Sequence, residues 1–263
     1  MSTLVRLFMG LALALAMAHP AWAADKPDCS RPLSLALHDH GLLYSSQTGE
    51  GIDKDVADEL IRRSGCKVGV TVMPRARIWQ LIESGALDFS LSGIGNRARD
   101  EFASFAWYFS NKYHLLVRND AHIRRLADFE GNAALRLGAI RGFRYSATGN
   151  RLVDRLDAER RVSYATHLDS LYQILIDNRV QAMIIEPFDY PAVESGTLRE
   201  LTTILEFDDP PVPHGLIMSK KALAPAQQAA WRALVDGMRA DGTVQRIFEK
   251  HFSADLARSM TRF

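Results

Sequence analysis

Two arginines follow a run of small residues in the stretch SLSGIGNRARDE, which begins at Ser90. Small residues let a backbone come close to a bound group. Arginine is the side chain best shaped to grip a carboxylate or a phosphate. The stretch is therefore a candidate site for a small anion, and the alternative is an ordinary loop with solvated charges.

The net charge of the chain after residue 23 argues against nucleic acid as a partner. Once residues 1–23 are set aside, 31 basic and 31 acidic side chains remain, so the net charge is zero. A neutral chain with scattered charges lacks the basic surface that nucleic acid requires. The eight histidines are also scattered, and none forms an H-E-x-x-H motif, so we expect no metal site and no cofactor.

The amino terminus has the three parts of a secretory signal peptide. Arg6 precedes an apolar run from Leu7 to Ala18, and Ala21-Trp22-Ala23 provides a small-residue cleavage signal. We predict cleavage after Ala23 and export. The apolar run is too short to span a bilayer, and no later segment has about 18 uninterrupted apolar residues.

Only two cysteines are present, Cys29 and Cys66. An isolated pair in an exported chain suggests a disulfide. Each precedes an apolar stretch, so parallel neighbouring strands would bring the two thiols to one end of a sheet. The alternative is two free buried thiols.

Strand-type and helix-type segments alternate, which argues for an α/β fold with parallel sheets. The predicted strands are Leu33–Leu37, Val68–Val72, Phe89–Leu91, Leu135–Ile140, Gln181–Ile185 and Leu216–Met218. The predicted helices are Lys54–Ser64 with Asp53 as N-cap, a helix opened by Pro74, Ser170–Ile176, Ala226–Arg239 and Thr243–Phe252.

Ligands of open α/β sheets gather at the carboxyl ends of the strands. Three segments follow the first three predicted strands: His38–Tyr44, Met73–Arg77 and Ser92–Arg99. We expect them to share one rim, which makes the opening stretch a candidate site by topology alone.

The order of short motifs resembles one family. These motifs are G-I-D-K-D at Gly51, G-A-L-D at Gly85, N-R-A-R at Asn96, Phe105-Ala106, His114–Asn119, Leu126–Gly131, Gly138–Gly142, Asn178–Glu186, D-G-T at Asp241 and Phe248–Phe252. Each motif is weak alone, but their order and spacing resemble the periplasmic solute-binding proteins of amino-acid ABC transporters, also called extracellular solute-binding protein family 3.

The resemblance implies a type II, Venus-flytrap fold. Each lobe is then a mixed, mainly parallel sheet flanked by helices, and two hinge strands join the lobes. The expected boundaries are residues 25–117 and 213–263 for the first lobe and 118–212 for the second. The implied protein is a periplasmic monomer that encloses an amino acid or similar zwitterion and delivers it to a membrane ABC permease in a transient complex.

The resemblance also assigns the two ends of the ligand. Arg99 matches the family arginine that grips the α-carboxylate through two parallel hydrogen bonds. Ser92, Gly93 and Asn96 would supply backbone N–H groups and short polar side chains to the same anion. Glu186 falls where the family places the acid for the ligand's ammonium, although the family usually has Asp. Surface roles for the arginine and the acid are the alternatives.

Five further residues are candidates at the same site. Tyr44 stands where the family often has a stacking ring, and His38 aligns with a polar contact of the first lobe; core positions are the alternative for both. Arg75 could face the cleft. Phe143 and Arg144 stand where the family commonly has small hydroxyl residues after Gly142. Arg141 or Arg144 could add a second cation that favours a ligand with an extra acidic group, and the alternative is that both are exposed.

Two other functions fit the same resemblance. Periplasmic cyclohexadienyl dehydratases resemble these binding proteins and need a general acid in a closed cleft, for which Asp189 is the candidate. The match around it is loose, so we expect a binding protein and no enzyme. A ligand-sensing subunit of a signalling system is the other alternative; most such sensors are fused to a membrane helix and a kinase domain, which this sequence lacks.

Overall fold

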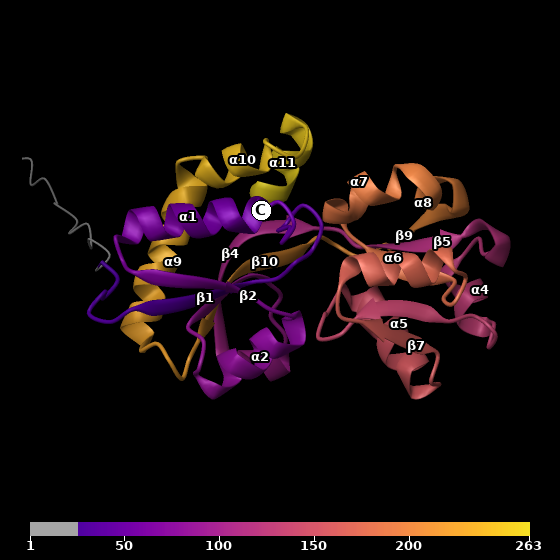
Figure 1. Cartoon of the computed structure of the whole chain (residues 1–263), viewed down its shortest axis with the longest axis horizontal. Coiled ribbons are helices and arrows are strands. Elements are labelled where there is room, and N and C mark those ends of the chain that lie inside the picture. The colour runs from indigo at the N-terminus through magenta and orange to yellow at the C-terminus, as the bar shows by residue number, and fades with distance from the viewer. Residues whose placement is uncertain (1–25) are drawn as a thin grey trace, which may run out of the picture.

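Two five-stranded sheets organise the chain. The computed structural model describes residues 26–263, so the predicted signal peptide, residues 1–23, lies outside the described residues. Each sheet carries helices, and the two units lie side by side as two lobes (Figure 1). Both ends of the described chain belong to the first lobe, and the middle of the chain forms the second. The predicted two-lobed α/β fold is confirmed.

The first sheet has the strand order β2-β1-β3-β10-β4. Strand β1 is parallel to β2 and β3, whereas β10 runs antiparallel to β3 and β4, so the sheet is mixed. Its strands are β1 (Leu33–Leu37), β2 (Val68–Val72), β3 (Phe89–Gly93), β4 (Ala103–Asn111) and β10 (Val212–Ser219). Its helices are α1 (Ile52–Ser64), α2 (Arg75–Ser84), α3 (Arg97–Asp100), α9 (Pro225–Ala240), α10 (Thr243–Phe248) and α11 (Ala254–Thr261).

The second sheet has the order β7-β6-β8-β5-β9 and is also mixed. Its strands are β5 (His114–Arg118), β6 (Leu137–Ile140), β7 (Val162–Ala165), β8 (Ala182–Ile185) and β9 (Thr202–Glu206). Its helices are α4 (Leu126–Gly131), α5 (Ala147–Ala158), α6 (Leu168–Ile176), α7 (Tyr190–Val193) and α8 (Gly196–Leu201), with 3₁₀ turns η1 (Asn119–Ala121) and η2 (Pro187–Asp189). None of the helices between residues 26 and 263 has the length and apolar character needed to cross a bilayer.

The chain passes between the sheets twice, from β4 to β5 and from β9 to β10. Residues 114–117 belong to the second sheet, because β5 pairs antiparallel with both β8 and β9. This differs from the expected boundary, which placed these residues in the first lobe. The return crossing ends where β10 begins at Val212, next to the expected boundary.

Two helix starts show how local sequence positions the site. Helix α2 follows Pro74, as predicted. Helix α1 is capped by Gly51 at φ 143°, and the prediction of Asp53 as N-cap is wrong. The Asp53 carboxylate instead turns into the first lobe, where it accepts hydrogen bonds from the hydroxyls of Ser92 (2.6 Å) and Tyr108 (3.1 Å).

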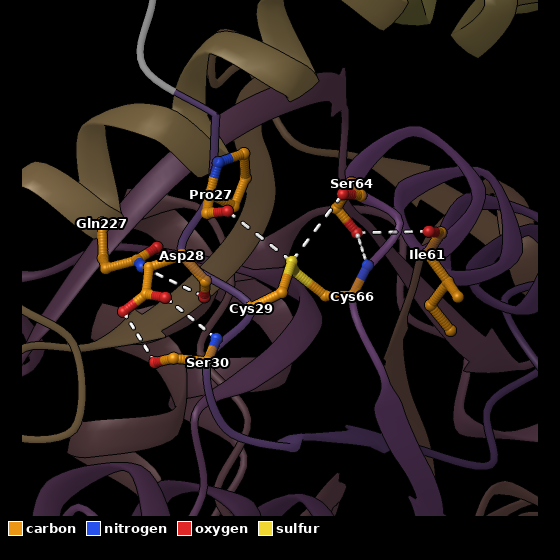
Figure 2. The surroundings of a disulfide bond; sticks show 8 residues. All are labelled: Pro27, Asp28, Cys29, Ser30, Ile61, Ser64, Cys66 and Gln227. Atoms are coloured by element: carbon orange, nitrogen blue, oxygen red, sulfur yellow. Dashed lines mark hydrogen bonds between the residues drawn. A yellow bond between two sulfur atoms is a disulfide. The ribbon is translucent and has the colours of Figure 1, made fainter.

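The predicted disulfide is present at the outer end of the first sheet (Figure 2). Cys29 and Cys66 each lie just before one of the parallel neighbours β1 and β2, whose register pairs Leu33 with Val68. This pairing brings the two Cα atoms to 4.9 Å from each other. The strand geometry that the sequence predicted therefore explains the bond.

One aromatic side chain of the second lobe is buried in the core of the first. Phe188 of η2 is 1% exposed and packs against Phe109, Phe248 and Phe252. The backbone N–H of Leu42 donates to the Phe188 carbonyl at 3.1 Å. This contact fixes the segment after β8 against the first lobe and holds the neighbouring Glu186 at the junction.

Candidate ligand-binding site

A cavity lies where the two lobes meet, with about 310 Å³ of empty space including its open mouth. The part of it that water could occupy is about 20 Å³, room for about one water molecule, so the lobes must move apart to admit a ligand. Its first-lobe wall comes from the segments after β1, β2 and β3, and its second-lobe wall from the segments after β6 and β8. The predicted common rim is confirmed.

Arg99 lies in α3 and points into this cavity. Its side chain is buried, and its guanidinium carbon lies 3.8 Å from the centre of the Trp79 ring. One N–H donates to the Ile94 carbonyl (2.8 Å), and another reaches across the cleft to the Gly142 carbonyl (2.9 Å). Burial, followed by the nearby Arg75, lowers the pKa of Arg99 to about 9, so the group stays charged at neutral pH.

Arg75, the first residue of α2, lines the same cavity. It is buried, and one N–H donates to the Leu91 carbonyl at 3.0 Å. Burial lowers the pKa of Arg75, and the charges of Asp53 and Glu186 oppose that effect. Among residues 26–263, neither Arg75 nor Arg99 forms an ion pair with a carboxylate. Arg77, one half-turn further along α2, is exposed.

Glu186 lies at the end of β8 and lines the cavity, but its carboxylate already has partners. Nε2 of His40 donates to one oxygen at 3.0 Å, and the Asn111 amide donates to the other at 3.1 Å. Burial raises the pKa of Glu186, but the hydrogen bond and charge of His40 outweigh it and leave the pKa lowered. Burial likewise lowers the pKa of His40, and its acidic neighbours raise it above the usual value overall. The two form a buried ion pair.

The loop after β6 closes the cavity from the second lobe. Gly142 has φ 84°, and a Cβ there would lie 2.9 Å from the Ala76 Cα in the first turn of α2, so only glycine allows this approach. Phe143 then places its ring 5.3 Å from His38 and 4.9 Å from His40, centre to centre. The two lobes therefore contact each other directly around the cavity.

Arg144 lines the mouth of the cavity and pairs with Asp154 at 2.7 Å. Its side chain is 41% exposed. Its charge is therefore partly neutralised and well solvated, unlike the charges of Arg75 and Arg99.

The side-chain and backbone donors of Ser92 are used within the first lobe and are not free for an anion. The hydroxyl of Ser92 donates to Asp53, and its N–H donates to the Tyr108 hydroxyl. A Cβ at Gly93 would lie 2.2 Å from the side chain of Ile217, so this glycine permits the close packing of β3 on β10. These two residues still line the cavity.

Three other expected contacts lie away from the cavity wall. Asn96 caps α3, because its side-chain oxygen accepts from the N–H of Arg99. Tyr44 packs in the first-lobe core and is not among the lining residues. His38 is buried beside Phe143 behind the wall. Asn96 therefore acts by capping the helix that carries Arg99, and Tyr44 acts by filling the first-lobe core.

Several residues that form the site were not among the candidates from the sequence. Trp79 packs in the first-lobe core and also lines the cavity under Arg99; its position four residues after Arg75 puts both on one helix face. Tyr113 also lines the cavity, and its hydroxyl is 2.8 Å from Nε2 of His214. Burial lowers the pKa of His214 to about 4, so this histidine is neutral. His40 had no signal in the sequence, because its partner Glu186 is 146 residues away.

Asp189, the candidate general acid of the enzyme alternative, turns away from the cavity. Its carboxylate accepts from the Tyr172 hydroxyl (2.7 Å) and from the Glu186 N–H (2.9 Å). Burial raises its pKa to about 6. Residues 26–263 contain no group of three or more His, Cys, Asp or Glu side chains placed to hold a metal ion.

Two lobes with a cavity at their junction define the class of two-lobed binding proteins. The family of bacterial extracellular solute-binding proteins, family 3, matches residues 40–254. The chain belongs to this family. A search of curated proteins finds no match.

Solved structures share the fold at low sequence identity. An ancestral arginine-binding protein bound to arginine is 20% identical, with a TM-score of 0.71 over 86% of this chain and 100% of that chain. The arginine-, lysine-, histidine-binding protein ArtJ from Geobacillus stearothermophilus is 15% identical, with a TM-score of 0.71 over 87% and 100%. The ancestral amino acid-binding protein AncCDT-1, a precursor of cyclohexadienyl dehydratase, is 18% identical, with a TM-score of 0.69 over 84% and 95%.

Proposed function

We propose that this protein is the periplasmic solute-binding component of an ABC importer and that it captures an amino acid or a related small carboxylate between its lobes. One observation carries the proposal: Arg99 is buried, points into the interlobe cavity and forms no ion pair within residues 26–263. A ligand carboxylate would receive its N–H groups in place of a backbone carbonyl, which gives a stronger, charge-assisted contact.

The remaining parts of the proposal follow from the family. Residues 1–23 would be the signal peptide that directs export. The first lobe would comprise residues 25–117 and 213–263 and the second residues 118–212, with the first boundary moved to the start of β5. A membrane permease would receive the ligand. The names of the similar structures, arginine-binding and amino-acid-binding, support an amino acid or its analogue.

We also propose that the protein binds without catalysing a reaction. A general acid must reach the bound ligand, and Asp189 is engaged by Tyr172 and the Glu186 N–H away from the cavity. Incubation with prephenate or arogenate, followed by ultraviolet absorbance, tests this; turnover would make the protein a dehydratase.

The binding role of Arg99 is tested by calorimetry on the purified protein with amino acids and small carboxylates. We expect Arg99→Met to weaken binding of the cognate ligand by at least about 100-fold, because a buried charge contact is lost. Arg97→Met is the matched control, since Arg97 lies two residues away and is exposed. Undiminished affinity in Arg99→Met would remove this role.

A further inference from the structure

Arg75 is a buried cation for which the described structure offers no counter-ion in contact. It is 4% exposed and lines the cavity. A guanidinium has five N–H donors, and Arg75 makes one hydrogen bond, to the Leu91 carbonyl, among residues 26–263. The remaining donors lie against the cavity, so the residue is placed to bind something there.

The position of Arg75 in its helix makes a purely structural role unfavourable. It is the first residue of the ten-residue helix α2, where the helix dipole disfavours a positive charge. Burying a cation without a paired anion adds a further penalty. The nearest acid behind it, Asp53, directs its carboxylate to the hydroxyls of Ser92 and Tyr108 and forms no ion pair with Arg75. An anion in the cavity would relieve both penalties.

The opposite wall does not offer the matching acid that a zwitterion needs. Glu186 is neutralised by His40 and bonded by Asn111, and neither partner is a ligand. Arg99 adds a second cation, and after burial the nearby charge of Arg75 is the next largest cause of its lowered pKa. The lining side chains therefore include two unpaired buried cations and one acid that is already paired.

We propose that the ligand of this cavity carries two carboxylates, one held by Arg99 and the other by Arg75. This inference rests on the proposed function and narrows its ligand class to small dicarboxylates, with or without an amino group. The rings of Trp79 and Phe143 lie beside the two guanidinium groups, at 3.8 Å and 5.7 Å from their carbons, and would cover a short carbon chain between the carboxylates.

The test compares ligands that differ by one charge. Calorimetry on the purified protein uses succinate, glutarate, L-aspartate and L-glutamate, each set against its monoamide: succinamate, glutaramate, L-asparagine and L-glutamine. We expect at least one dicarboxylate to bind about 100-fold more tightly than its monoamide. The pair in which this occurs shows whether the amino group is needed. A monoamide or a neutral amino acid that binds as tightly as every dicarboxylate would overturn the inference, and so would the absence of dicarboxylate binding at millimolar concentration.

A matched pair of variants assigns the second carboxylate. Arg75→Met should reduce the preference for the dicarboxylate over its monoamide to below about tenfold, whereas Arg77→Met on the exposed side of the same helix should leave it unchanged. Thermal unfolding without ligand checks that both variants fold. If Arg75→Met proves unstable, Arg75→Lys, which keeps the charge, takes its place and should keep part of the preference for the dicarboxylate. An unchanged preference in a folded Arg75→Met would exclude Arg75 as the partner.

The two proposals fail separately in this design. Tight binding of a neutral amino acid that depends on Arg99 but not on Arg75 would overturn the dicarboxylate inference and leave the proposed function intact. Dicarboxylate binding that is indifferent to Arg99→Met would remove the Arg99 role on which both depend.

Discussion

Buried arginines in the second lobe and in the cleft have similar exposed fractions but different hydrogen-bond partners. In the second lobe, Arg161 and Arg118 are 6% and 7% exposed; in the cleft, Arg99 and Arg75 are 9% and 4% exposed. Arg161 donates five hydrogen bonds, to four backbone carbonyls and to Glu159. Arg99 donates two from its guanidinium and Arg75 donates one, all to backbone carbonyls.

Hydrogen-bond satisfaction, and not burial, therefore separates the two kinds of arginine. Arg118 follows the pattern of Arg161, with two bonds to Asp120 and two to the carbonyls of Leu175 and Ile176. A side chain whose donors are all used holds the fold together. A side chain held in place by one or two carbonyls, with its other donors towards a cavity, costs stability and is a candidate to bind a ligand.

The strongest test of this difference is the effect of Arg161→Met on stability. Removing the guanidinium leaves four carbonyls of the α4–β6 and neighbouring segments without their donor, so we expect a loss of about 3–5 kcal/mol in the free energy of unfolding. Arg99→Met should cost less than about 1 kcal/mol or increase stability, because it removes a poorly compensated buried charge. Urea denaturation of both variants measures this, and equal losses would contradict the distinction.

The disulfide adds a third region to the comparison with the cleft, one that stabilises the fold and does not contact the cleft. Cys29 and Cys66 are 37 residues apart, and closing that loop stabilises the folded state by about 4 kcal/mol in the chain-entropy model. We expect the double variant with serine at both positions to lose up to this amount. Its ligand affinity, measured by calorimetry below its unfolding transition, should change less than threefold. A large loss of affinity would show that the outer edge and the cleft are coupled.

The sequence predicted the parts of the fold that local patterns determine. Strands β1 and β2 were predicted with the observed bounds, because short apolar runs between turn residues are strong local signals. The disulfide was predicted because each cysteine lies just before one of those strands and because an exported chain reaches an oxidising compartment. The rim followed from topology, since parallel strands bring their carboxyl ends to one edge.

The site was predicted where a residue stands at a family motif or on the predicted rim of the sheet. Arg99, Arg75 and Glu186 were identified, and all three line the cavity. The pairing of Glu186 with His40, and the use of Ser92 by Asp53, could not be predicted, because each joins segments far apart in the chain. Asn96 and Tyr44 stand at motif positions, but in this chain they serve the cap of α3 and the first-lobe core.

The variant Glu186→Gln tests whether Glu186 binds the ligand or only compensates the charge of His40. If Glu186 received a ligand ammonium, its neutralisation would weaken binding by about 100-fold. If the acid serves only to compensate His40, the amide keeps a hydrogen-bond acceptor, and His40 loses the partner whose hydrogen bond raises its pKa and becomes neutral, so the net charge of the cavity changes little. We therefore expect dicarboxylate affinity to stay within tenfold of the wild type. Calorimetry with the best dicarboxylate decides between the two, and a 100-fold loss would restore the ammonium role.

The smallest expected effect concerns Asp53, the buried acid behind Arg75. Burial raises its pKa to about 6, and hydrogen bonds from Ser92 and Tyr108 and the charges of Arg75 and His40 oppose that rise. Because the folded pKa lies above the unfolded value, its contribution to stability is complete below pH 4 and is lost as the pH rises through 6. Asp53→Asn, whose amide resembles the protonated acid in shape, removes this loss.

The difference between wild type and Asp53→Asn isolates this group from the other titrating residues. Between pH 5 and pH 8 the free energy of unfolding of the wild type should fall by roughly 1 kcal/mol relative to the variant. Urea titrations at both pH values measure it. Parallel pH profiles would show that the pKa of Asp53 is not raised and that its carboxylate is already ionised at pH 5.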